Sequence, residues 1–101
     1  THWIMFVEIE AEELKKRLAD QQKPFVLDVR ETYEFEDGSI ADINIPMAEV
    51  LPRVKEIEHQ TEIIVCCLSG KRSKAVAYHL AKKLNHAKVY TLSGGLESLN
   101  L

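Results

Sequence analysis

The chain has 101 residues, with 13 Lys or Arg against 16 Asp or Glu, and its formal net charge is −3. This length suits one small domain that buries roughly 60–65% of its unfolded surface. The charge leaves no basic surface for nucleic acid or an anionic membrane, and the apolar stretches are shorter than the roughly 20 residues of a membrane span. We therefore expect one soluble domain over residues 1–101, with no nucleic-acid or membrane partner.

The two cysteines of the chain are adjacent, at Cys66 and Cys67. Adjacent cysteines are poorly placed for an ordinary disulfide, and no Cys or His spacing in the chain matches a metal site. We therefore expect a reducing, cytoplasmic setting and no metal or other cofactor. Because neighbours on a strand point to opposite faces, we interpret Cys66 as a small buried hydrophobic residue rather than half of a redox pair.

The first half of the chain alternates strand and helix signals. The predicted elements are a strand over residues 6–9, a helix over 10–21, a strand over 25–29, one or two helical turns over 31–37 and a strand over 43–46. Pro24 cannot continue a helix and therefore separates the first helix from the apolar strand that follows. In the next turns, Tyr33 and Phe35 are placed for packing on one side, and Gly38 fits a helix-terminating position.

The second half continues this alternation. Its predicted elements are two short turns over residues 47–57, a strand over 63–66, a helix after residue 73, a strand over 88–92 and a helical stub after 95. Pro52 divides the first segment, and an apolar stripe at helical spacing supports the long helix. Alternating strands and helices predict an α/β fold, in which a mostly parallel sheet of about five strands has helices on both faces.

The segment over residues 67–73, here called the cysteine loop, joins the most apolar predicted strand to the long helix. Such a turn directs backbone N–H groups and the positive end of a helix dipole toward its centre. We therefore expect the Cys67 thiol to be largely ionised at neutral pH, with Lys71 and Arg72 adding positive charge for an anionic donor. Gly70 permits unusual backbone angles, and we expect Ser73 to cap the helix.

The order and spacing of five motifs resemble the rhodanese-like family across nearly the whole chain. These motifs are Leu27-Asp28-Val29-Arg30-Glu31, Gly38, Ile43-Asn44-Ile45-Pro46, the cysteine loop and Leu92-Ser93-Gly94-Gly95. The resemblance implies a single rhodanese domain over residues 1–101 in which Cys67 carries sulfur. Its thiolate would take the outer sulfur of a donor, hold it as a persulfide and pass it to a nucleophilic acceptor.

The resemblance also implies the remaining site residues and the partners. The active-site loop and substrate-binding residues would be Leu68, Ser69, Gly70, Lys71, Arg72 and Ser73. Asp28 and Arg30 would brace the site from the neighbouring strand, and a purely structural role is the alternative for both. The donor would be a small anionic sulfur compound, and the acceptor a thiol, cyanide or a sulfur-carrier protein. Residues 45–50 resemble the subgroup that is fused to E1-like adenylyltransferases, which charge sulfur carriers.

Five residues depart from the family pattern. Leu68 replaces a residue that is basic in many members, which makes the pocket mouth more apolar and weakens the expectation that thiosulfate is the physiological donor. Ser39 replaces a frequent histidine, and Ala41-Asp42 replaces a Pro-Gly pair, so the rim of the entrance is expected to differ in shape. Leu99 replaces a tryptophan, a change expected to affect packing rather than chemistry.

Two other functions remain open. Four residues separate Cys67 from Arg72, whereas the related dual-specificity phosphatases have five, so sulfur transfer is favoured over phosphatase or arsenate-reductase activity. A catalytically silent docking or regulatory domain with an incidental cysteine is the second alternative. Residues 69–73 superficially resemble a P-loop but lack its first glycine and have arginine after the lysine, so nucleotide binding is not expected.

Overall fold

A parallel sheet of five strands organises the protein, whose computed structural model describes residues 6–100. The strands are β1 (Val7–Ile9), β2 (Phe25–Asp28), β3 (Ile43–Asn44), β4 (Glu62–Cys66) and β5 (Lys88–Leu92). Their order across the sheet is β1-β5-β4-β2-β3, and every neighbouring pair is parallel. The most apolar predicted strand, β4, is therefore the central one, with the side chains of residues 63–66 fully buried.

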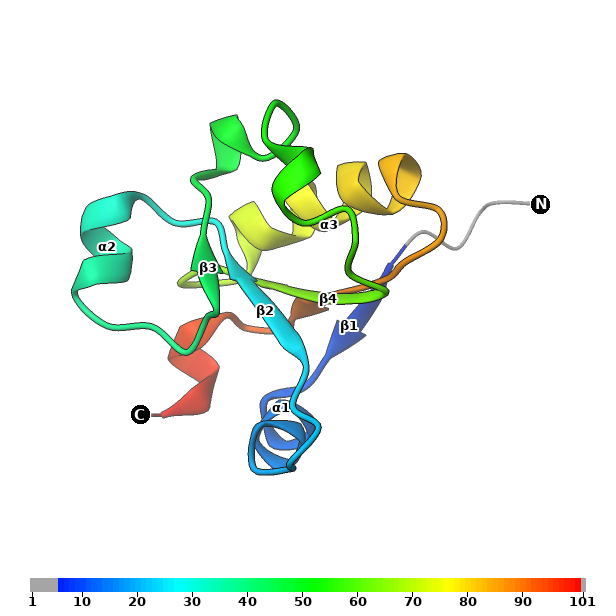
Figure 1. Cartoon of the computed structure of the whole chain (residues 1–101). Helices are drawn as coiled ribbons and strands as arrows, with labels where there is room; N and C mark the ends of the chain where they lie inside the picture. Colours follow the sequence, from blue (N-terminus) through cyan, green and yellow to red (C-terminus); the bar gives the residue numbers. More distant parts are fainter. Residues whose placement is uncertain (1–5, 101) are drawn as a thin grey trace.

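Helices cover both faces of this sheet, as predicted (Figure 1). The helical segments are α1 (Ala11–Leu18), α2 (Thr32–Glu36), α3 (Lys71–Lys83) and the 3₁₀ turns η1 (Met47–Glu49), η2 (Val54–Glu56) and η3 (Leu96–Leu99). Figure 1 shows α3, η1 and η2 on one face of the sheet and α1 with η3 on the other. No helix within residues 6–100 has the length and apolarity needed to cross a membrane.

Alternation along β4 divides the apolar core into two clusters. Ile63 and Val65 pack in the cluster beneath α3, whereas Ile64 and Cys66 pack in the cluster that includes Leu14 of α1. Cys67, the next residue along, belongs to the α3 side. The prediction that the two cysteines face opposite sides of the sheet is therefore confirmed.

The boundaries of two predicted elements are corrected by local hydrogen bonds. The first helix ends at Leu18 rather than residue 21, and the Asp20 carboxylate accepts a hydrogen bond from the Gln22 N–H in the turn that follows. The third strand has two residues instead of four, although the Ile45 N–H still donates to the Asp28 carbonyl. Pro46 lacks an N–H and therefore cannot continue the ladder.

The packing predicted for Tyr33 is wrong. Its side chain is 73% exposed, while Phe35 on the same short helix is partly buried. The helix α2 has only five residues and buries none of them completely, so it does not form a continuous apolar face. Its first turn is stabilised instead by a reciprocal capping box between Glu31 and Glu34.

Candidate functional site

The cysteine loop begins where the central strand ends. Cys67 directly follows β4, and α3 begins four residues later at Lys71. Gly70 is the N-cap of α3 and has a left-handed conformation with φ of 100°, which confirms the expectation that its backbone is unusual. The thiol is thereby placed at the carboxyl edge of a parallel sheet, where ligands of such folds collect.

Three polar groups surround the Cys67 sulfur. The Gly70 N–H lies 3.1 Å from Sγ and the Ser73 N–H lies 3.3 Å from it, both as donors. The thiol lies 3.5 Å from Ser73 Oγ, to which it can donate, and the Cys67 side chain is fully buried. Backbone N–H groups of the loop were expected to point at the sulfur, and within the described residues those of Gly70 and Ser73 do so. They provide fixed positive dipoles against which a negative sulfur is stabilised.

The expected capping role of Ser73 is wrong, because the helix starts two residues before it. The Gly70 carbonyl accepts the Lys74 N–H, which sets the first turn of α3 and leaves Ser73 inside that turn. The Ser73 hydroxyl lies 3.2 Å from the Gly70 carbonyl and 2.8 Å from Thr91 Oγ1 on β5. The fully buried Ser73 hydroxyl therefore links the start of α3 to β5 next to the Cys67 sulfur instead of capping the helix.

A contact that sequence analysis missed holds the outer backbone of the loop. The Leu96 N–H donates to the Cys67 carbonyl at 2.8 Å, and the Glu97 N–H donates to the Leu68 carbonyl at 3.1 Å. Gly95 has a φ of 67°, and a Cβ there would overlap the Leu68 carbonyl. The consecutive glycines at 94 and 95 were the available signal, because two glycines before a helical turn permit a close approach between backbones.

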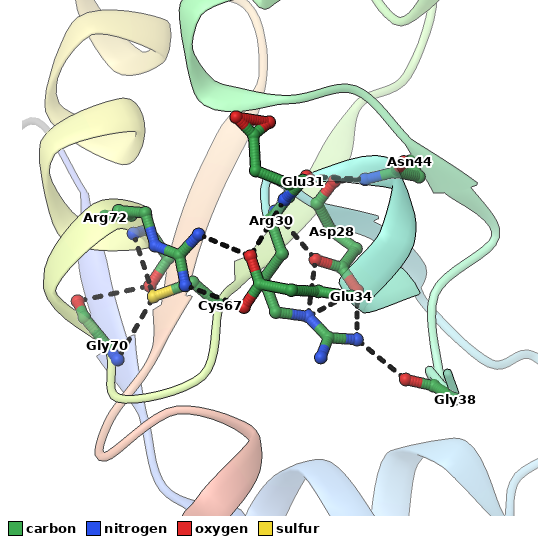
Figure 2. A network of polar contacts seen from close by, with 10 residues as sticks. Asp28, Arg30, Glu31, Glu34, Gly38, Asn44, Cys67, Gly70 and Arg72 are labelled. Carbon is green, nitrogen blue, oxygen red and sulfur yellow. Dashed lines mark hydrogen bonds and ion pairs between the residues drawn. The ribbon is translucent and has the colours of Figure 1, made fainter. Parts of the chain in front are cut away.

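The Arg72 guanidinium forms a bidentate ion pair with Glu34 of α2 (Figure 2). Its Nη1 and Nη2 atoms lie 2.9 and 3.2 Å from Glu34 Oε1 and Oε2. The ion pair with Arg72, assisted by a hydrogen bond from the Glu31 N–H, lowers the pKa of Glu34 to about 2. Of the two cations that the sequence offered to an anionic donor, Arg72 is therefore already matched by a carboxylate, whereas Lys71 is exposed.

Asp28 and Arg30 form a second ion pair beside the loop, and both are buried. Arg30 Nη2 lies 2.8 Å from Asp28 Oδ2 and 2.7 Å from the Gly38 carbonyl, and the hydrogen bonds to Asp28 raise the pKa of Arg30. Two further partners were not predicted: Ser39 Oγ donates to Asp28 Oδ2 at 2.7 Å, and Asn44 Nδ2 donates to the backbone carbonyls of Asp28 and Arg30. The network braces the segment over residues 38–44 from β2 (Figure 2).

A cavity of about 520 Å³ lies beside the cysteine loop. It extends between the segment that follows α2 and the turn η3, and Leu68 of the loop and Arg30 of the buried ion pair both contribute to its wall. The lining residues are Arg30, Gly38, Ser39, Ile40, Leu68, Leu96, Glu97 and Asn100. This volume is within the range of small-molecule sites.

Cys66 is chemically separate from this site. Burial in the apolar cluster on the α1 side raises the pKa of the Cys66 thiol far above its ordinary value. A neutral, fully buried thiol is a weak nucleophile and packs as a small hydrophobic group. Both cysteines are free, but among the described residues the Cys67 sulfur is the one with backbone N–H donors within hydrogen-bond distance, so Cys67 is the reactive candidate of the pair.

Known proteins share the family and the fold of this chain. The chain belongs to the rhodanese-like domain family, whose model matches residues 10–100. A protein named sulfurtransferase from Allochromatium vinosum is 32% identical over 91% of this chain and 86% of its own length. A thiosulfate sulfurtransferase, GlpE, from Coxiella burnetii is 30% identical over 72% of this chain and 68% of its own length.

Solved structures give the same fold. A rhodanese-related protein from Thermoplasma volcanium superposes with a TM-score of 0.82 at 32% identity, covering 94% of this chain and 91% of that protein. The two proteins are therefore alike along almost their whole lengths. The resemblance that the sequence motifs suggested is confirmed at the level of family and fold.

Proposed function

We propose that the chain is a sulfurtransferase that carries sulfane sulfur as a persulfide on Cys67. The observation that carries this proposal is the buried Cys67 sulfur at the start of α3, within hydrogen-bond distance of two backbone N–H donors. These donors favour an anionic sulfur without a nearby base. The same donors remain available when a second sulfur is attached to the first.

The reaction has two substitution steps at sulfur. In the first, the Cys67 thiolate attacks the outer sulfur of the donor, a new S–S bond forms, and the donor's own S–S bond breaks. Sulfite leaves when thiosulfate is the donor, and a thiolate leaves when a persulfide is the donor. In the second step an acceptor nucleophile attacks the outer sulfur, and the Cys67 thiolate is the leaving group. Cyanide and thiol acceptors, including a thiol on a sulfur-carrier protein, fit this step.

The dimensions of the loop support sulfur as the group transferred. Four residues lie between Cys67 and Arg72, and Arg72 is engaged with Glu34 at 2.9 Å. A phosphatase needs a wider loop whose arginine clamps the oxygens of the phosphoryl group. Phosphatase and arsenate-reductase activity are therefore disfavoured.

Two free thiols at the centre of the fold also suit a reducing compartment, and we place the protein in the cytoplasm.

Mass spectrometry of the intact protein tests the proposal. After incubation with thiosulfate or an organic persulfide, the wild-type chain is expected to gain the mass of one sulfur atom, which cyanide then removes. Cys67→Ser abolishes the gain, while Cys66→Ala, the adjacent control on the opposite face, retains it. An unchanged wild-type mass with every donor would contradict the proposal and support a docking domain with a silent cysteine. Hydrolysis of an aryl phosphate or reduction of arsenate would also contradict it.

A further inference from the structure

Two of the three cations in and beside the cysteine loop, Arg72 and Arg30, are neutralised within the protein, whereas Lys71 is exposed and in no ion pair among the described residues. Both terminal nitrogens of Arg72 are bound by Glu34, at 2.9 and 3.2 Å. Arg30 is bound by Asp28 through Nε and Nη2, and its Nη2 atom also donates to the Gly38 carbonyl. Neither arginine therefore offers an unmatched charge to an entering anion.

The cavity beside the loop adds apolar surface and one more carboxylate. Ile40, Leu68 and Leu96 supply its apolar wall, and Leu68 is 42% exposed. Glu97, also in the wall, is exposed and is not in an ion pair in the described chain. Lys71 is exposed at the start of α3 but does not line this cavity. The wall thus combines apolar side chains with Arg30, whose charge Asp28 matches, and the unpaired carboxylate of Glu97.

We infer that the sulfur donor is an organic persulfide, with a carbon group seated in this cavity, rather than thiosulfate. This inference rests on the proposed function. Thiosulfate has two negative charges and no apolar part, so it gains nothing from Leu68 and is repelled by Glu97. An alkyl persulfide is neutral or singly charged, and its carbon atoms are removed from water when they contact Leu68 and Leu96.

The transfer from such a donor is balanced without an added oxidant or reductant. The Cys67 thiolate attacks the outer sulfur of R–S–SH, and the electron pair of the broken S–S bond leaves with the inner sulfur as R–S⁻. The product is the Cys67 persulfide, which keeps the hydrogen of the outer sulfur or releases it to solvent. The released thiol then leaves the cavity and allows an acceptor to enter.

Two stable donors that differ in charge and apolar surface test the inference. Benzenethiosulfonate has one charge and an aromatic ring, thiosulfate has two charges and no carbon, and each delivers one sulfur to a thiol. The measurement is the rate of sulfur gain on Cys67 with each donor, divided by the rate of the same donor with free cysteine. The corrected ratio is this value for benzenethiosulfonate divided by the value for thiosulfate. It is expected to be about ten or more, because only benzenethiosulfonate buries apolar area.

Three variants show whether the cavity causes this preference. Leu68→Arg removes apolar wall and adds a cation, and it is expected to shift the ratio toward thiosulfate by about five- to tenfold. Glu97→Gln shifts it in the same direction by about twofold. Leu51→Arg is the matched control, because Leu51 is 46% exposed but does not line this cavity, and it leaves the ratio unchanged.

The outcomes separate the inference from the proposed function. A corrected ratio that favours thiosulfate overturns the inference, and so does a ratio that Leu68→Arg does not change. In both cases, sulfur gain on Cys67 leaves the proposed function intact. Absence of sulfur gain with both donors overturns the proposed function itself. If circular dichroism shows that Leu68→Arg does not fold, the surface variant Glu97→Gln decides the question by the direction of its shift.

Discussion

The cysteine loop and the ion-pair network beside it are adjacent, yet different kinds of interaction hold them in place. The loop is fixed by its backbone, through N–H groups of residues 70 and 73 on the sulfur and those of 96 and 97 on the loop carbonyls. The network is fixed by side chains, through Asp28, Arg30 and Ser39. Chemistry at Cys67 therefore depends on chain conformation, whereas the shape of the rim depends on residue identity.

This difference predicts which substitutions each region tolerates. Backbone contacts survive most side-chain changes but fail where a Cβ enters a space that only glycine can occupy. A buried ion pair fails when one partner is lost, because the other charge remains out of water. Four experiments test this contrast, in decreasing order of expected effect.

Gly95→Ala tests the backbone-held region. The new Cβ overlaps the Leu68 carbonyl and the residue has a positive φ, so the free energy of unfolding is expected to fall by about 3–5 kcal/mol. Urea denaturation measures this change. Gly38→Ala is the control: its φ is 135°, but a Cβ meets nothing within 4 Å, so strain alone lowers the free energy by about 1–2 kcal/mol. Equal losses would show that the contact with Leu68 is unimportant.

Arg30→Ala tests the region held by side chains. Asp28 is fully buried and loses its cation, so the free energy of unfolding is expected to fall by about 3 kcal/mol. Arg53→Ala, which breaks two ion pairs on the exposed surface, is the control and is expected to have a much smaller effect on the urea midpoint. If the two variants lose the same stability, burial does not distinguish the two sites.

Ser39→Ala tests a single member of the network. It removes the 2.7 Å hydrogen bond to Asp28 but leaves the bonds from Arg30, so the expected loss of unfolding free energy is about 1 kcal/mol. In a double-mutant cycle with Arg30→Ala, the losses of unfolding free energy of the two single variants should not add, because both substitutions act on the Asp28 carboxylate. Strict additivity would argue that the hydrogen bond and the ion pair act independently.

The Glu34–Arg72 pair has the smallest expected effect, and it depends on pH. Folding lowers the pKa of Glu34 from 4.5 to about 2, so its stabilising effect is complete above pH 4.5 and is lost as the pH falls toward 2. Glu34→Gln is expected to lower the unfolding free energy by less than about 1 kcal/mol at pH 7, because the pair is partly exposed. Wild type and variant should converge near pH 2, as followed by urea midpoints across pH 2–7.

Sequence patterns predicted the parts of the fold that arise from local periodicity and burial. The short apolar run ending at Cys66 predicted a buried strand, and the stripe through Val76 and Leu80 predicted a helix with one face in the core. The position of Cys67 between these two elements followed from their order. The N-cap lies three residues before the predicted Ser73, because Gly70 in a left-handed conformation precedes the first residue of the helix.

The remaining parts of the site depend on contacts between distant segments. Ser39 and Asn44 reach Asp28 because β3 pairs with β2 in a specific register, and no local pattern specifies that register. The partner of Arg72, Glu34, lies 38 positions away on a short helix of its own. No local pattern in the sequence pairs two residues that far apart.

The opposite orientation of Cys66 and Cys67 leaves the site without a resolving thiol. The chain has two cysteines in total, and the second lies across the sheet in another apolar cluster. Under the proposed function, a sulfur held on Cys67 therefore has no second thiol within residues 1–101 to which it can pass, and closure to a disulfide with Cys66 is blocked by geometry. The proposed persulfide is then discharged by a nucleophile that reaches Cys67 from outside this domain, so its lifetime depends on the supply of that acceptor.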